Sequence, residues 1–234
     1  MCRAQEESDG MRWTSQADYN DPASLSARLR ARRMQLFMEL VRDCYRRQGH
    51  CRVIDVGGTP AYWAQVEDTF FAENHCEVTV VNLDAHSGSP PRPHLRLCFG
   101  DGCALAFGDN AFDLAHSNSV IEHVGDAARM QAFAGEIRRV APRYYVQTPN
   151  YWFPIEPHYL APAIQFLPRA WQAELLYRLP LGRVPRPSTR AQARRFVEGI
   201  QLLTRRDMAR LFPDGMLVGE RFCGLTKSWM AVRR

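Results

Sequence analysis

Short apolar runs alternate with amphipathic stretches along the middle of the chain. Five runs predict buried strands, namely RVIDVG (52–57), EVTVVNL (77–83), LRLCFG (95–100), FDLAHSNS (112–119) and YYVQTPN (144–150). Between them, apolar positions at helical spacing predict helices over 60–73 and 126–140. This alternation is typical of a parallel sheet covered by helices. The pattern therefore predicts a doubly wound α/β fold.

The flanking segments depart from this alternation. Residues 23–48 predict an arginine-rich amphipathic helix. Residues 151–199 hold seven prolines among aromatic residues and leucines, which predicts short helices and turns. After them, Thr204 can cap a helix, and MLVGERF and TKSWMAV predict a closing β-hairpin. We expect a single domain over 1–234, made of the helix 23–48, a core 52–150, an insertion 151–199 and a closing segment 200–234.

Composition excludes several classes of protein. The chain has 234 residues, of which 46% are hydrophobic and 24% charged, as in an ordinary folded domain. Its seven cysteines are odd in number and form no C-x-x-C motif, which argues against a disulfide framework and a structural zinc site. We find neither the apolar core of a signal peptide nor the roughly 20 apolar residues of a bilayer span. We therefore expect a soluble cytoplasmic protein.

The positive charge of the chain is a weak indication of an acidic partner. The formal net charge is +5, and Lys227 is the only lysine among 30 basic residues. A uniform bias toward arginine can follow from codon composition alone, so it does not by itself indicate nucleic-acid binding. A solvated face explains the arginines of helix 23–48 better than an anionic partner does.

Glycines and polar residues cluster at the carboxyl ends of the predicted strands, which read DVGGT, NLD, GDG, SNS and TPN. Ligands bind at this edge of a doubly wound sheet. Gly57 and Gly58 allow close backbone approach, and Thr59 and Pro60 supply a cap and a first-turn proline to the next helix. Because the turn lacks the G-x-G-x-x-G spacing, the sequence disfavours a dinucleotide ligand.

The segments DVGG (55–58) and GDGCALAFGDNAFDLAHSNSVIEHV (100–124) resemble the class I S-adenosylmethionine-dependent methyltransferases, in the small-molecule, ubiquinone-type branch called methyltransferase type 11. The resemblance covers roughly residues 50–150. It implies a Rossmann-like, mostly parallel seven-stranded sheet with an antiparallel last strand and a helical insertion after the fifth strand. It also implies S-adenosylmethionine as cofactor, bound by the core 52–150, with 151–199 as an acceptor-side insertion or lid.

The resemblance assigns the methionine part of the cofactor to the first turn. Asp55 would orient the methionine amino group directly or through water. The residues that would pack against the methionine and ribose are Gly57, Gly58 and Thr59. Ser117 and Asn118 would line the reaction chamber at the methionine end.

The resemblance assigns the ribose and adenine to the next two strand ends. Asp84 would accept both ribose hydroxyls, because a carboxylate offers two oxygens to a vicinal diol. Asn82 is the alternative, since it stands directly after the VTVV run where an acidic residue is usual. Asp101 with Gly102 would hold the adenine amine and pack against the ring.

A hydroxyl acceptor must lose a proton, and histidine is the side chain best suited to take it near neutral pH. His158 follows Glu156 directly after the fifth predicted strand, and Glu156 could hold its imidazole in one tautomer. His123 is the second candidate, and a structural role for all three residues stays open. No Asp/His cluster with ligand spacing suggests a metal site, so we expect metal-independent transfer, most simply to oxygen.

The acceptor is the least specified part of the prediction. The apolar residues of 151–199 suit a lid over a small-molecule or lipid-linked acceptor, or contact with a membrane surface, and they equally suit a core of the insertion itself. SNSV stands where methyltransferases of nucleic-acid bases show an N-P-P-Y-type motif, so no nucleic-acid partner is expected. The turn has Pro60 and Ala61 where a further glycine is usual, which motivates an alternative: a catalytically inactive, cofactor-binding interaction or regulatory protein. Neither the acceptor nor the oligomeric state follows from the sequence.

Overall fold

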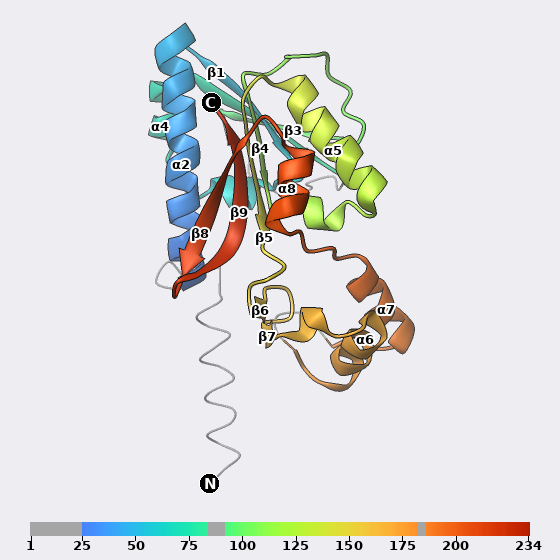
Figure 1. Ribbon diagram of the computed structural model, residues 1–234. Coiled ribbons are helices and arrows are strands. Elements are labelled where there is room, and N and C mark those ends of the chain that lie inside the picture. Colours follow the sequence, from blue (N-terminus) through green and yellow to red (C-terminus); the bar gives the residue numbers. More distant parts are fainter. Residues whose placement is uncertain (1–24, 84–91, 182–185) are drawn as a thin grey trace.

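A seven-stranded mixed sheet forms the centre of the protein (Figure 1). The computed structural model describes residues 25–83, 92–181 and 186–234. The strands are β1 (Cys51–Val56), β2 (Cys76–Asn82), β3 (Leu95–Phe99), β4 (Leu114–Asn118), β5 (Tyr144–Pro149), β8 (Met216–Phe222) and β9 (Leu225–Arg233). Their order in the sheet is β3-β2-β1-β4-β5-β9-β8. The five strands predicted in the core are thus confirmed, as is the closing hairpin.

The direction of the strands confirms the predicted fold class. β1 pairs in parallel with both β2 and β4, and β4 pairs in parallel with β5. β9 runs antiparallel to β5 and to β8, as the resemblance implied. The chain order reverses between β1 and β4, so the carboxyl ends of these two neighbouring strands flank the place where doubly wound sheets bind ligands.

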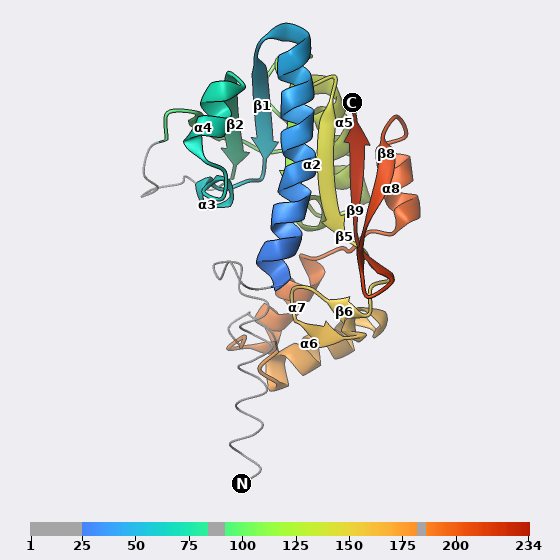
Figure 2. The same cartoon turned by 90° about the vertical axis from the view of Figure 1, so that its left-hand side faces the viewer.

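Helices cover both faces of the sheet, and each interface is a separate apolar core. One face carries α2 (Leu25–Gln48), α3 (Pro60–Trp63) and α4 (Asp68–Glu73), while α5 (Ala127–Val140) and α8 (Arg205–Leu211) cover the other (Figures 1 and 2). Phe37 of α2 and Phe133 of α5 are almost completely buried in the first and second core. None of the helices in the described ranges combines the length and the apolar character that crossing a membrane requires.

Side-chain caps fix the starts of three helices, and the sequence indicates two of these caps, Thr59 and Thr204. The Thr59 hydroxyl accepts a hydrogen bond from the Tyr62 amide at the start of α3. Asp126 accepts from the Arg129 amide at the start of α5. Thr204 forms a capping box at the start of α8, so an otherwise unsatisfied amide is paired in each helix.

The prediction of one helix over 60–73 is wrong, because the chain forms the two short helices α3 and α4 instead. Trp63 ends the first, and α4 begins only at Asp68. Arg92 donates from Nη1 to the Trp63 carbonyl at 2.7 Å and from Nη2 to the Val66 carbonyl at 2.8 Å. A guanidinium from a distant segment therefore satisfies carbonyls that a continuous helix would have paired internally.

The insertion 151–199 forms a small lobe beyond the end of β5 (Figure 1). Its elements are β6 (Ile155–Glu156), β7 (Ala161–Pro162), the 3-10 turn η2 (Ile164–Phe166), α6 (Arg169–Arg178) and α7 (Arg190–Glu198). Tyr159 and Leu176 belong to a core of this lobe's own, whereas Trp152 and Trp171 remain about two-thirds exposed. The apolar residues of the insertion thus divide between an internal core and an exposed surface.

Candidate functional site

The turn after β1 requires glycine at two successive positions. Gly57 has a φ of +80°, in the left-handed region that favours glycine, and a Cβ there would overlap with Val120. A Cβ on Gly58 would overlap with the Asp55 carboxylate. The backbone of the turn therefore lies directly against Asp55 and Val120, with no room for a side chain.

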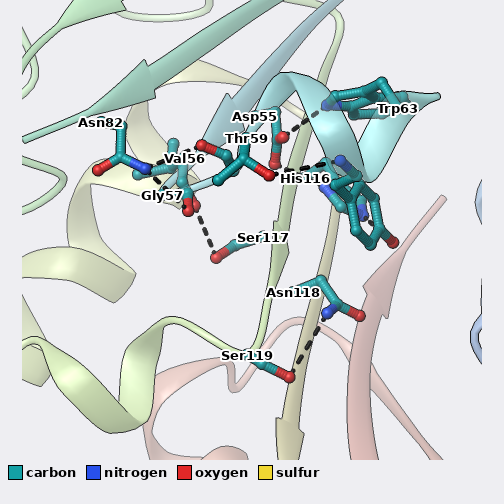
Figure 3. A network of polar contacts seen from close by, with 12 residues as sticks. Asp55, Val56, Gly57, Thr59, Trp63, Asn82, His116, Ser117, Asn118 and Ser119 are labelled. Atoms are coloured by element: carbon teal, nitrogen blue, oxygen red, sulfur yellow. Dashed lines mark hydrogen bonds and ion pairs between the residues drawn. The ribbon is translucent and has the colours of Figure 1, made fainter. Parts of the chain in front are cut away.

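The carboxylate of Asp55 is fully buried and held by two ring systems (Figure 3). Its Oδ2 accepts from the Trp63 indole Nε1 at 2.7 Å, and its Oδ1 lies 2.7 Å from His116 Nδ1. His116 Nε2 in turn lies 3.3 Å from the Tyr62 hydroxyl. Burial raises the pKa of Tyr62, so this hydroxyl stays neutral and is no base. The network fixes the position of the carboxylate that the resemblance assigns to the cofactor's amino group.

Replacement of Trp63 by phenylalanine should lower the free energy of unfolding by about 2–4 kcal/mol, because it removes buried ring volume and leaves one Asp55 oxygen without its donor. Urea denaturation measures this loss. The matched control is Trp171→Phe, because Trp171 is 66% exposed and its truncation should change the free energy by less than about 0.5 kcal/mol. Equal stabilities for the two variants would contradict a supporting role for the indole.

Two further polar side chains brace the turn. Asn82 Nδ2 donates to the Gly58 carbonyl at 2.9 Å and to the Gly57 carbonyl at 3.3 Å (Figure 3). The hydroxyl of Ser117 is fully buried and donates to the Val56 carbonyl at 2.9 Å. The structure thus places the Ser117 side chain against the backbone of β1, whereas the sequence had suggested a place in the chamber wall.

A cavity of about 280 Å³ lies over the carboxyl ends of β1 and β2. We call it the adenosine-side cavity. Its lining includes Gly57, Asn82, Asp101, Gly102, Ser119, His123 and Phe133. A Cβ on Gly102 would lie 2.7 Å from Val56 and 2.8 Å from Phe133, so the missing side chain leaves room between two apolar walls. Such a slot suits a flat aromatic ring.

Asp101 lies ionised at the edge of this cavity. Its Oδ1 accepts from the Cys103 amide at 2.9 Å, and Arg129 Nη2 lies 2.9 and 3.1 Å from its two oxygens. The Cys103 amide and the Arg129 guanidinium hold the pKa of Asp101 below its usual value. The carboxylate is therefore an acceptor at neutral pH, as recognition of an exocyclic amine requires.

A second cavity of about 320 Å³ opens on the other side of the turn, and we call it the methionine-side cavity. Its lining includes Arg30, Arg33, Asp55, Gly57, Gly58, Thr59, His116, Asn118 and Ser119. Gly57 and Ser119 line both cavities, so the two adjoin at the glycine turn, and we refer to them together as the groove. The buried Asn118 Oδ1 has no hydrogen-bond partner within the described residues.

The chemistry of the groove lining suits S-adenosylmethionine. Glycine at 57, 58 and 102 keeps side chains out of it, and Asp101 presents an ionised acceptor at one end. The unpaired Asn118 oxygen and two arginines lie at the other end, where the methionine amine and carboxylate would lie. Asp84, expected at the ribose, falls outside the described residues, and the Asn82 amide group is engaged by the turn carbonyls.

The fold brings the three predicted catalytic residues into one chain of contacts. His158 Nδ1 lies 2.6 Å from Glu156 Oε1, and His158 Nε2 lies 3.2 Å from His123 Nε2. The other oxygen of Glu156 accepts from the backbone amides of His158 and Tyr159, both at 2.7 Å. Glu156 is 1% exposed, so its carboxylate is a rigid anchor for the His158 ring. Separation in sequence by 35 residues hides the pairing of His123 with His158.

Glu122 joins this group, although sequence reasoning did not select it. It lies in the 3-10 turn η1 (Ile121–His123), and its side chain is completely buried. Its Oε2 accepts from the Thr148 hydroxyl at 2.9 Å, whereas Oε1 has no hydrogen-bond partner within the described residues. Burial raises the pKa of Glu122 to about 7. The sequence signal that could have identified Glu122 is its position directly before His123 in the segment IEH.

The two histidines differ in their electrostatic environment. Burial and the neighbouring His158 lower the pKa of His123, against a hydrogen bond to the Gly199 backbone. Burial also acts to lower the pKa of His158, but the Glu156 carboxylate reverses this and leaves the pKa above its usual value. Of the two rings, His158 is therefore the one that holds a proton more readily, because Glu156 stabilises its positive charge.

Arg30, Arg33, Tyr62 and Trp63 are further residues of the groove region that the sequence did not single out. Arg33 forms a buried ion pair with Glu220 at 2.9 Å, and Arg30 lies over the Tyr62 ring. The helix α2 was interpreted as a mostly solvated arginine face, but the structure turns these two arginines toward the groove. Arginines at helical spacing gave no signal that separated buried from exposed positions.

Comparison with known protein families gives a match to the central part of the chain. Residues 54–143 match the family model described as a methyltransferase domain. Among curated proteins, no sequence matches the chain.

The following solved structures resemble this chain at low sequence identity. A Pyrococcus horikoshii protein is 16% identical, with a TM-score of 0.48 and coverage of 92% of this chain and 93% of that one. A SAM-dependent methyltransferase from Methanosarcina mazei is 14% identical, with a TM-score of 0.47 and coverage of 79% and 92%. Phosphoethanolamine N-methyltransferase 2 of Haemonchus contortus, in complex with S-adenosyl-L-methionine, is 19% identical, with a TM-score of 0.34 and coverage of 43% and 25%. Each of these TM-scores lies below 0.5.

Proposed function

We propose that the chain, whose residues 54–143 match the methyltransferase-domain model, uses S-adenosylmethionine to methylate an oxygen of a small-molecule or lipid-linked acceptor without a metal ion. The observation that carries this proposal is the contact between the groove and the histidine pair. His123 lines the adenosine-side cavity and lies 3.2 Å from His158, whose other nitrogen meets Glu156. The groove therefore lies next to a pair of histidines, one of which contacts a buried carboxylate.

The groove residues would bind and orient the cofactor. S-adenosylmethionine supplies a methyl group on a sulfonium leaving group. Asp101 would accept from the adenine amine, with the ring against Gly102, and Asn82 or Asp84 would meet the ribose. At the other end, Asp55 would hold the methionine amino group through the turn.

Arg30 and Arg33 extend the cofactor assignment to the methionine carboxylate. Both line the methionine-side cavity, where they place positive charge beside Thr59 and Asn118. A carboxylate at this end would be favoured electrostatically, while the ion pair between Arg33 and Glu220 keeps Arg33 in one orientation. Ser117 would support the site from behind, through Val56.

His158 would take the proton from the acceptor hydroxyl. Glu156 accepts from Nδ1, which leaves the lone pair of the neutral ring on Nε2. This Nε2 lies 3.2 Å from His123 Nε2, and His123 lines the adenosine-side cavity, so the acceptor's proton would reach His158 through the His123 ring. Removal of the proton makes the acceptor oxygen nucleophilic at the moment of transfer.

The insertion offers a place for the acceptor. A cavity of about 360 Å³ lies inside it, lined by Tyr151, Glu156, Tyr159, Gln165, Arg169 and Gln172 among others. Its volume suits a small molecule, and its polar lining suits hydroxyl groups. Nearby, the rings of Trp152 and Phe166 stack on each other and remain exposed, which supports contact with a lipid tail or a membrane surface.

We also propose that the protein acts in the cytoplasm. Within the described ranges, six cysteines are free thiols, and Cys223 is exposed. Thiols persist in a reducing compartment, whereas an oxidising one favours disulfides.

Thermal unfolding with added cofactor tests the proposal most directly. S-adenosylmethionine or S-adenosylhomocysteine at about 100 times the dissociation constant should stabilise the native state by roughly 2.7 kcal/mol, which raises the Tm by about 5–10 °C for a chain of this size. NAD should produce no shift, because the turn lacks the dinucleotide spacing. A shift with both sulfur ligands then leads to an assay of methyl transfer to oxygen in quinones, sugars and lipid-linked sugars.

Two results would contradict the proposal. The absence of any shift would mean that the turn with Pro60 and Ala61 does not bind the cofactor. A rise in Tm with the cofactor, but no methyl transfer to any acceptor, would favour the alternative of an inactive interaction or regulatory protein. The same alternative would be favoured if replacement of His123 or His158 changed no measured activity.

A further inference from the structure

Glu122, His123 and His158 bring three potential metal-ligand atoms close together. One ligand atom from each residue lies within 4.8 Å of the other two. The group combines two imidazoles with a carboxylate, the donor set of several catalytic zinc sites. The cluster cannot be recognised from helical or strand spacing in the sequence. His158 comes from the insertion, whereas Glu122 and His123 come from η1.

Glu122 Oε1 is a potential metal ligand that makes no hydrogen bond within the described residues. Glu122 is 0% exposed, and its Oε1 has no hydrogen-bond partner within the described residues. Thr148 holds the other oxygen at 2.9 Å, so the carboxylate cannot turn away freely. An unpaired buried oxygen costs free energy that a bound cation would recover.

The distance between the two rings matches a shared ion. Zinc binds imidazole nitrogen at about 2.0–2.1 Å in tetrahedral geometry, so two such ligands lie roughly 3.3 Å apart. The Nε2 atoms of His123 and His158 lie 3.2 Å apart. The spacing of these two atoms is therefore already that of two ligands on one ion, and the ligand atom of Glu122 lies within 4.8 Å of both.

The contacts behind the rings are those of metal-binding histidines. His158 directs Nδ1 at the buried Glu156 carboxylate at 2.6 Å, and the His123 ring hydrogen-bonds the Gly199 backbone. Such carboxylate and carbonyl partners fix the ring and the tautomer of a ligating histidine. With hydrogen on the nitrogen that faces its partner, His158 presents its Nε2 lone pair to His123.

We propose that Glu122, His123 and His158 bind a divalent transition-metal ion, for which Zn²⁺ is the probe, and that the bound ion inhibits methyl transfer. Inhibition rests on the proposed function, because the ion occupies the same Nε2 lone pair of His158 that accepts the acceptor's proton. The metal is thus a regulator of a reaction that proceeds without it. Binding of the metal ion requires no acceptor, so it can be tested independently of methyl transfer.

Isothermal titration of Zn²⁺ into the full chain, with any affinity tag removed and after treatment with a chelator, tests the site. The wild-type protein should bind one ion, and His123→Gln and His158→Gln should each weaken binding at least about 100-fold. Glu156→Gln should weaken it about 10–100-fold, as loss of a partner behind a ligating histidine does. His50→Gln is the control, since this exposed histidine lies apart from the cluster.

Co²⁺ spectra separate this site from the free thiols. Cobalt bound by imidazole and carboxylate lacks the ultraviolet charge-transfer band of a cobalt thiolate. Absence of binding, equal affinity in the double variant of His123 and His158, or a thiolate band would each overturn the metal site. Thermal unfolding of each variant shows whether it is folded. Zn²⁺ binding without inhibition of methyl transfer would retain the site but overturn the regulatory role.

Discussion

Alanine at position 58 should weaken the binding of S-adenosylmethionine at least about 100-fold. The methyl group would overlap with the Asp55 carboxylate, so Asp55 has to move. It can do so only by breaking its 2.7 Å contacts with Trp63 and His116, which leaves a buried charge poorly paired. We expect the free energy of unfolding to fall by about 2–4 kcal/mol as well.

Calorimetric titration with S-adenosylhomocysteine and urea denaturation measure the two effects. Gly108→Ala is the matched control, because no atom lies within 4 Å of a Cβ built there and the φ of Gly108 is ordinary. This control should retain cofactor affinity and stability. Wild-type affinity in Gly58→Ala would show that the cofactor does not bind across the turn.

The fold could be predicted because its signals are local. Each strand of the core is a short apolar run, and Thr59 and Thr204 carry cap signals at helix starts that the structure confirms. The break between α3 and α4 could not be predicted in the same way. It depends on Arg92, which reaches the Trp63 and Val66 carbonyls from a segment that sequence periodicity does not connect to them.

The sequence indicates where the candidate site lies, but it does not indicate which side chains meet there. The glycine turn and Asp101 are readable because strand ends meet at one edge of the sheet. The contacts of Asp55 with His116 and of His123 with His158 join residues 61 and 35 positions apart, and nothing in either local segment specifies the partner. Ser117 shows the limit of assignment by position, since its hydroxyl faces Val56 and not the groove.

The histidine pair itself yields the sharpest functional prediction, with Glu156→Gln as the test. Glu156 Oε2 accepts from the amides of His158 and Tyr159, and a glutamine carbonyl can retain both hydrogen bonds. The glutamine NH₂ then faces His158 Nδ1, where it donates instead of accepting and forces the ring hydrogen onto Nε2. The base loses its lone pair although the lobe stays folded, so we expect kcat to fall about 10²–10⁴-fold.

A loss of kcat alone does not separate proton transfer from simple structural damage, so the pattern of constants decides the role of Glu156. Its side chain lines neither half of the cofactor groove, and therefore the dissociation constant for S-adenosylmethionine should stay within about twofold of wild type while kcat collapses. Glu174→Gln is the control in the same lobe, because Glu174 pairs with Arg178 and Arg190 at the surface. Such a pair contributes little, so this variant should retain both constants. A normal kcat in Glu156→Gln would remove His158 as the base, and the proton would then have to leave by another route.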